Sequence, residues 1–234
     1  MSGKVIGIPP RLVNDPSCVL YLRGEGPDGS TQIRDWSQSH KTVTVNGNTR
    51  NSTTKTKFPP ASIYFDGTGD YLTVPDSDDF ALGSSNWTYS FWLNPQTLPT
   101  GTDNKIIYSQ RVDDNNYQYI FLYGDGTIYF RNISGGTMIT SFYATHGMST
   151  GNWYQVVVER DGNTPRVYIN GTSKTVTEAT TISGKTLANI AATVYIGARN
   201  DGLFSYDGYM DEFAIFKKHI PIEKLYPQYR RFVV

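Results

Sequence analysis

The sequence has little cysteine, no net charge and no long apolar run. A single cysteine, Cys18, excludes an intramolecular disulfide, and its apolar setting predicts a buried thiol. Lys and Arg together number 21, as do Asp and Glu, so the basic surface that nucleic-acid binding needs is absent. No stretch approaches the roughly 18 apolar residues of a membrane span, and residues 1–15 lack the apolar run of a signal peptide. We therefore expect neither nucleic acid nor membrane as a partner.

Helix-period patterns are also nearly missing. The one segment that favours a helix is short, from Pro221 to Tyr226, with proline in its first turn. Elsewhere, short runs rich in β-branched and aromatic residues alternate with Gly, Asn and Asp turns, which is typical of an all-β sandwich or barrel. The clearest predicted strands are Val19–Leu22, Ala61–Phe65, Tyr71–Val74, Thr88–Leu93, Tyr117–Tyr123, Thr127–Asn132, Tyr154–Arg160, Arg166–Ile169, Thr193–Gly197 and Met210–Phe216.

The chain is long enough for one large domain. A folded chain of 234 residues buries about 70% of the surface that it exposes when unfolded, which suffices for a core without disulfides. No linker rich in Pro, Gly or Ser divides the sequence. We predict one domain over residues 17–225, with tails at 1–16 and 226–234. Within the polar stretch 23–60, Val43 and Val45 favour one more strand.

One hairpin can be predicted in detail, around Asp125-Gly126. Asp-Gly favours a two-residue turn, because both central residues need positive φ. Such a turn pairs Gly124 with Thr127, and Phe121 with Phe130. The predicted core face then holds Tyr119, Phe121, Tyr123, Ile128 and Phe130, and the opposite face holds Gln118, Ile120, Leu122, Thr127, Tyr129 and Arg131. A mixed second face is expected of a sheet surface that meets solvent or a ligand.

Alternation assigns the faces of two further strands. In Trp87–Leu93, the predicted core residues are Tyr89, Phe91 and Leu93, while Trp92 faces away. In residues 154–159, the predicted core residues are Tyr154, Val156 and Val158, while Gln155 faces away.

Five segments follow one another along the chain: Ser62–Leu72, Trp87–Leu93, Trp153–Gly162, Val167–Gly171, and Ile196–Arg199 followed by Tyr206–Phe213. Together, in this order, they resemble the laminin-G-like, concanavalin A-like lectin/glucanase jelly roll. The resemblance spans Cys18 to Ile220 and implies an all-β, two-sheet antiparallel sandwich with one short C-terminal helix. The sequence also resembles the version of this domain that is found in bacteriophage structural proteins.

The family includes glycoside hydrolases and lyases, so the catalytic residues must be sought directly. A glycosidase needs two carboxyls about 5–9.5 Å apart. The glucanases of the superfamily carry a Glu-x-Asp-x-Glu type of run, and this sequence has none. Asp211 and Glu212 are adjacent and point to opposite faces of a strand. We therefore expect no enzymatic activity and assign no catalytic residues, although a carboxylate pair brought together from distant strands stays open.

Sugar binding needs flat aromatic rings for stacking and planar polar groups for hydrogen bonds. The outward faces offer both, and the loop Gly197–Tyr206 adds a rim. The alternative is that the aromatic residues pack against loops that cover the sheet. The predicted sugar-binding residues are Trp92, Gln118, Tyr129, Arg131, Gln155, Arg199, Asp201 and Tyr206.

The resemblance also implies a calcium ion with a structural role. In related jelly rolls, an ion joins an aspartate of the last strand to carbonyl groups near the first strands. Asp211 matches that aspartate, and the turn Phe65-Asp66-Gly67 offers a carbonyl group. Asp211 and Gly67 are therefore the expected calcium ligands, and the alternative is that Asp211 only accepts backbone hydrogen bonds.

These expectations combine into one functional hypothesis. We expect a carbohydrate-binding or adhesion module of a phage or viral particle, located in the virion or outside the cell after lysis. Its partners would be a glycan or polysaccharide and other virion proteins. The alternatives are a purely structural virion protein without a sugar site, whose surface tyrosines serve protein contacts, and a glycan-degrading enzyme.

Overall fold

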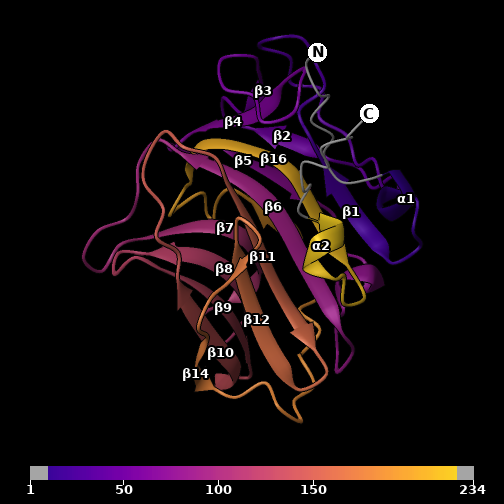
Figure 1. Cartoon of the computed structure of the whole chain (residues 1–234), viewed down its shortest axis with the longest axis vertical. Helices are drawn as coiled ribbons and strands as arrows, with labels where there is room; N and C mark the ends of the chain where they lie inside the picture. Colours follow the sequence, from indigo (N-terminus) through magenta and orange to yellow (C-terminus); the bar gives the residue numbers. More distant parts are fainter. Residues whose placement is uncertain (1–9, 226–234) are drawn as a thin grey trace, which may run out of the picture.

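The computed structural model describes residues 10–225, which form two packed antiparallel sheets (Figure 1). Sheet A contains, in order, β13 (Thr172–Ser173), β12 (Thr164–Ile169), β11 (Tyr154–Asp161), β6 (Trp87–Pro95), β16 (Asp207–Phe216), β4 (Ser62–Asp66) and β3 (Arg50–Ser52), with β1 (Cys18–Leu22) also paired to β16. Sheet B contains, in order, β14 (Thr177–Thr180), β10 (Thr137–Thr145), β9 (Thr127–Ser134), β8 (Asn116–Tyr123), β7 (Asn104–Asp113), β15 (Val194–Ile196), β5 (Tyr71–Val74) and β2 (Thr44–Asn46). All ten predicted strands are confirmed, and β2 includes the expected Val45.

Strand β16 pairs with two different strands along one of its edges. Its first residues pair with β4, and Phe213–Phe216 pair with β1. The change occurs at a bulge where Glu212 has a φ of 53°. A bulge inserts a residue and bends the strand, so β1 can take over the edge that β4 leaves.

Aromatic side chains join the two sheets in the core. Trp87 of β6 stacks on Phe130 of β9 with ring centroids 4.6 Å apart, and Phe130 stacks on Phe142 of β10 at 5.2 Å. Tyr89, Phe91 and Leu93 face this core as expected. These rings have almost no solvent exposure, so the interior between the sheets is filled by side chains.

A second, smaller cluster covers the outer face of sheet A. The α-helices α1 (Pro10–Val13) and α2 (Ile222–Leu225) lie beside β1 (Figure 1). Leu12 of α1 and Leu225 of α2 are buried there against Cys18, Val157 and Phe216. The C-terminal helix was expected and α1 was not, since residues 1–16 were assigned to a tail. The expected tail at 226–234 lies outside the described residues.

The hairpin between β8 and β9 differs from its prediction by one residue. Tyr123 pairs with Thr127, so the loop has three residues, Gly124–Gly126, and Gly126 ends it with a φ of 85°. Three-residue loops of this kind end in a left-handed residue, which glycine provides without strain. The carboxylate of Asp125 closes the loop by accepting a hydrogen bond from the Thr127 amide at 3.0 Å.

This shift of one residue in register places each β8 side chain on the opposite face of the sheet from the one predicted. Because side chains alternate across a strand, one residue of register moves every side chain to the other face. Ile120 and Leu122, expected outside, are fully buried in the core. Three residues expected in the core instead point outward: Tyr119, Phe121 and Tyr123. On β9 the prediction holds, with Ile128 and Phe130 inside and Tyr129 and Arg131 outside.

Candidate functional site

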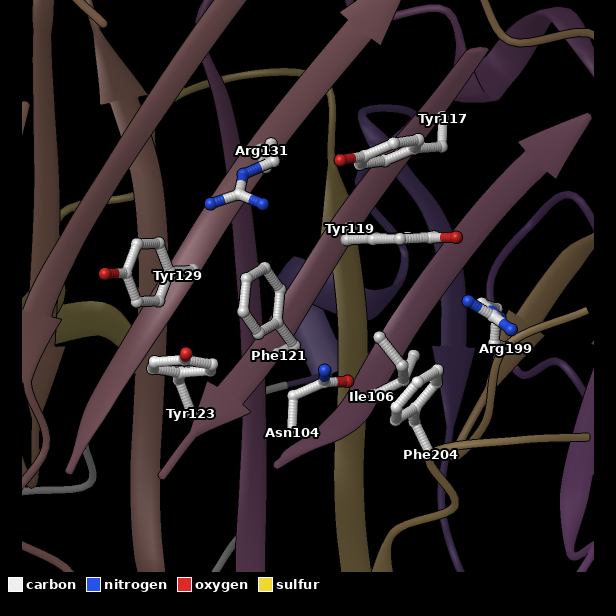
Figure 2. A pocket seen from close by; sticks show the side chains of 10 residues that line it. All are labelled: Asn104, Ile106, Tyr117, Tyr119, Phe121, Tyr123, Tyr129, Arg131, Arg199 and Phe204. Carbon is white, nitrogen blue, oxygen red and sulfur yellow. The ribbon is translucent and has the colours of Figure 1, made fainter. Parts of the chain in front are cut away.

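A groove of about 330 Å³ opens on the outer face of sheet B. Strands β7, β8 and β9 supply its floor, and the loop after β15 supplies one wall (Figure 2). Six of its lining residues are aromatic, two are arginines, and none is acidic. The groove is lined by Asn104, Ile106, Tyr117, Tyr119, Phe121, Tyr123, Tyr129, Arg131, Arg199 and Phe204.

The aromatic rings form a row across neighbouring strands. Tyr143 of β10, Tyr129 of β9 and Phe121 of β8 are directly paired in the two antiparallel ladders. Tyr129 stacks on Tyr143 with centroids 4.7 Å apart and on Phe121 at 5.0 Å, with an interplanar angle of only 5° in the second pair. Such cross-strand aromatic pairs stabilise a sheet and keep the rings in place. The row therefore provides a fixed apolar surface.

A second aromatic pair lies further along β8. Tyr117 stacks on Tyr119 with ring centroids 4.2 Å apart. Figure 2 shows the Tyr119 ring edge-on, with Tyr117 on one side and Phe121 and Asn104 toward the other. One face of the Tyr119 ring is thus covered by Tyr117, while its other face turns toward the part of the groove that Phe121 and Asn104 border.

Arg131 of β9 lies among these rings. It is paired with Tyr119 across the strands, and its guanidinium lies 5.4 Å from the Phe121 centroid and 5.5 Å from the Tyr129 centroid. Its Nε donates to the Ser141 hydroxyl at 3.5 Å. Among residues 10–225, no carboxylate lies within ion-pair distance of this guanidinium.

Arg199 forms the rim on the opposite side, and it is held in place. Its Nε lies 3.0 Å from both carboxylate oxygens of Asp201. Its guanidinium also lies 4.6 Å from the centroid of Phe204. The hydrogen bonds to Asp201 raise the pKa of Arg199, so the side chain stays charged and fixed.

Tyr119 and Tyr129 provide neutral hydrogen-bonding groups in the groove. Burial raises the pKa of Tyr119. It also raises the pKa of Tyr129, which is less deeply buried. Both hydroxyls therefore keep their protons at neutral pH and can donate as well as accept. Because the lining contains no Asp or Glu, the groove offers stacking and hydrogen bonding but no pair of carboxyls.

The structure brings together part of the predicted sugar site. Tyr129, Arg131 and Arg199 line the groove, and Asp201 joins it through its ion pair with Arg199. These four residues come from β9 and from the loop after β15, which approach each other only in the folded sheet.

Two predicted residues lie in the core instead. The Gln118 side chain donates to the Tyr89 hydroxyl at 3.0 Å and accepts from the Asn132 amide at 3.2 Å. Tyr206 is fully buried, and its hydroxyl donates to the Tyr209 carbonyl at 3.2 Å. Gln118 was misplaced by the hairpin register, and Tyr206 was placed on a rim although its ring packs edge-on against Phe65.

Two others lie on the outer face of the opposite sheet. Trp92 faces away from the core as predicted but is only 4% exposed, because Phe58 and Lys57 cover its ring. Gln155 donates to the carbonyl of Leu225 at 2.9 Å beneath α2. Since Trp92 and Gln155 belong to sheet A, neither lies in the groove on sheet B.

Sequence reasoning missed much of the groove. Within Tyr117–Tyr123, aromatic residues alternate with Gln118, Ile120 and Leu122. Ile and Leu are fully buried more often than Tyr, so this alternation was the available signal for the true outward face. The missed residues are Asn104, Ile106, Tyr117, Tyr119, Phe121, Tyr123 and Phe204.

The two expected calcium ligands are not brought together. The Asp211 carboxylate accepts hydrogen bonds from the amides of Phe58 at 3.2 Å and Glu212 at 3.0 Å, and burial raises its pKa. Gly67 follows β4 beyond the pairing of Asp66 with Asp207. Asp211 lies four residues further along β16, roughly 13 Å away at the usual strand rise. Calcium needs six to eight oxygen ligands, so these residues do not fit it.

Two features are absent from residues 10–225. No group of three or more His, Cys, Asp or Glu side chains is arranged to hold a metal ion in this part of the chain. No described helix has the length and apolar character needed to cross a bilayer.

The sequence matches the family described as the concanavalin A-like lectin/glucanases superfamily over residues 66–222. This match covers more than half of the chain, so the protein belongs to that superfamily, and the resemblance of the sequence to the superfamily is confirmed. The comparison with curated proteins found no match.

Solved structures with this fold include bacterial toxin domains. The binding domain of botulinum neurotoxin DC, in complex with SialylT, matches 91% of this chain with a TM-score of 0.66 and 16% identity. The botulinum neurotoxin serotype G binding domain matches 89% with a TM-score of 0.69 and 15% identity. The binding domain of Paraclostridial Mosquitocidal Protein 1 matches 89% with a TM-score of 0.67 and 16% identity.

This chain spans about half of each neighbour, between 49% and 51% of its length. At these identities the likeness shows a shared fold and no more.

Proposed function

We propose that this protein is a carbohydrate-binding module without enzymatic activity, and that it holds glycans in the groove on sheet B. The observation that carries the proposal is the fixed row of outward aromatic rings next to two arginines. Sugars present apolar C–H faces and rings of hydroxyls, which suit aromatic stacking and planar hydrogen-bonding groups. Membership of a lectin/glucanase superfamily supports the same function.

The lining chemistry supports binding rather than hydrolysis. A glycosidase places two carboxyl groups on either side of the bond that it cleaves. The groove is lined by no Asp or Glu, and the nearby Asp201 is engaged by Arg199. The structural neighbours described above are binding domains, one of them in complex with SialylT, which agrees with a binding role.

The biological setting stays a prediction. The expectation that the module belongs to a phage or viral particle, and contacts other virion proteins, comes from the resemblance of the sequence alone. Purified virions probed with an antibody to this protein would test it, and a signal confined to the host fraction would contradict it.

The test of the proposed function is a broad glycan array with the wild-type protein and two tyrosine variants. Tyr119→Ala removes a ring from the groove, whereas Tyr64→Ala removes a partly exposed ring from β4 in the other sheet. We expect the wild type and Tyr64→Ala to bind the same glycans. Tyr119→Ala should bind them at least about tenfold more weakly, as truncating a central aromatic contact does.

Circular dichroism must show that both variants fold. A blank array with folded wild-type protein would overturn the proposal. Release of shortened products from a bound polysaccharide would overturn its non-enzymatic part.

A further inference from the structure

The charged residues that line the groove are all basic. Its lining contains two arginines and no acidic residue, although the whole chain has equal numbers of acidic and basic residues. Neutral glycan sites need hydrogen-bonding groups but no net charge. An excess of cations inside an aromatic groove therefore indicates a ligand that carries the opposite charge.

The two arginines differ in whether a carboxylate is paired with the guanidinium. Arg199 is engaged by both carboxylate oxygens of Asp201. The nearby Arg111, at the end of β7, is in turn paired with Asp114 at 2.7 Å. Arg131 has no such partner among the described residues, and only its Nε is engaged, by the neutral Ser141 hydroxyl. The positive charge that remains available to a ligand is that of Arg131.

Arg131 is also arranged to bind an anion in a defined direction. Its Nε faces Ser141, and the neighbouring rings of Phe121 and Tyr129 fix the guanidinium. The two terminal nitrogens are left as a planar pair of donors, which matches two oxygens of a carboxylate or sulfate group. In Figure 2 the hydroxyl of Tyr117 points toward the same guanidinium and adds a hydroxyl group beside it.

We propose that the groove is selective for acidic glycans, with the carboxylate or sulfate group of the sugar bound by Arg131. The Tyr117 hydroxyl assists at that anion, and the apolar face of the sugar ring rests on the aromatic rings around it. This inference rests on the proposed glycan-binding function and assigns its substrate class. Charge-assisted, paired hydrogen bonds to a partly desolvated guanidinium are stronger than neutral ones, so the acid group should dominate the selectivity.

The test compares acidic glycans with neutral forms of the same chains. Oligogalacturonides and their carboxyl-reduced counterparts form one arm, and heparin oligosaccharides and their fully desulfated, N-acetylated, carboxyl-reduced counterparts form the other. We expect at least one acidic form to bind about tenfold or more tightly than its neutral form in isothermal titration calorimetry. The arm that shows the difference identifies the anionic group.

Two variants with the same change of charge locate the effect. Arg131→Gln should lower the affinity for the acidic form to that of its neutral form. Arg50→Gln, which removes a guanidinium 4.7 Å above the Tyr64 ring on the other sheet, should leave both affinities unchanged. Arg131→Lys, which keeps the charge but loses the planar pair of donors, should restore part of the preference.

The outcomes separate this inference from the function on which it rests. Equal affinities for acidic and neutral forms, with binding lost in Tyr119→Ala, would overturn the acidic selectivity and leave the glycan-binding function standing. An acidic preference that falls equally in Arg131→Gln and Arg50→Gln would also overturn the assignment to Arg131. No binding to any glycan, acidic or neutral, would overturn both.

Discussion

Arg131 of β9 lies directly opposite Tyr119 of β8, and both side chains project from the outer face of sheet B into the same groove. This pairing exists because the hairpin loop has three residues, since a two-residue loop would move the aromatic residues of β8 into the core. Asp125 stabilises the loop through the Thr127 amide, and Gly126 adopts the left-handed conformation that the loop requires. The proposed site therefore depends on the local structure of one loop.

The register can be tested by comparing neighbouring residues of β8. Ile120→Ala should lower the free energy of unfolding by about 2–5 kcal/mol, because a fully buried side chain leaves a cavity. Tyr123→Ala should cost about 1 kcal/mol, because that ring loses only edge-on contacts with Phe121 and Tyr129. Urea unfolding followed by tryptophan fluorescence measures both. The opposite order of costs would mean that the observed register is wrong.

Gln118 should matter for stability and not for binding. Replacing it with alanine removes one hydrogen-bond partner from the buried Tyr89 hydroxyl and one from the buried Asn132 amide. We expect Gln118→Ala to lower the free energy of unfolding by about 1–3 kcal/mol, with glycan affinity unchanged. A folded variant of normal stability that no longer binds glycans would contradict this and would show that Gln118 belongs to the binding site.

Much of the fold could be predicted because its strands alternate clearly. Strands such as Trp87–Pro95 and Tyr154–Asp161 carry most of their apolar residues on one parity, which indicates the core face without any knowledge of the turns. Tyr117–Tyr123 is apolar or aromatic on both parities, so the loop alone decides its register. Asp125-Gly126 suits more than one loop length, and the packing around the loop selects the longer one. The amide of Gly124, for example, donates to the carbonyl of Asp103 at 3.0 Å.

The alternation of side chains along a strand also predicts which of them face away from the core, but it does not predict which other residues cover them. Trp92 and Gln155 face away from the core as predicted, yet Lys57 and Phe58 cover the first and Leu225 covers the second. These covering residues come from distant parts of the chain. A two-sheet sandwich also has two outer faces, and alternation does not tell which sheet a strand joins. This is why a site predicted as one surface is divided between two.

His146 should make stability depend on pH near neutrality. Its buried ring accepts a hydrogen bond from the Met148 amide at Nδ1, at 2.9 Å, and burial lowers its pKa from the usual value of 6.5. Because the unfolded chain then binds the proton more readily, the stability is fully present above about pH 6.5. It is lost as the pH falls from there toward the lower pKa of the folded state.

His146→Asn keeps an acceptor for the Met148 amide but does not titrate. Thermal unfolding of the wild type should therefore show a midpoint that falls between pH 7 and pH 5.5, whereas the variant should show a smaller change. Equal slopes in the two proteins would contradict the assignment to His146.

Calcium should have no effect on this protein. Asp211 lies within β16 whereas Gly67 follows the end of β4, and the Asp211 carboxylate is already bonded to two backbone amides. We expect the thermal unfolding midpoint and the glycan affinity to be the same in calcium and in excess chelator. A midpoint raised by calcium, and lost in Asp211→Asn, would show that an ion site forms there after all.

The central claim is that glycans bind in the groove on sheet B. A crystal structure of the protein with the tightest-binding oligosaccharide from the array tests it most directly. We expect a sugar ring stacked on the aromatic residues of β8 and β9, with its acidic group within hydrogen-bond distance of Arg131. A sugar bound instead on sheet A, beside Trp92, or at a loop away from Tyr119 would contradict it.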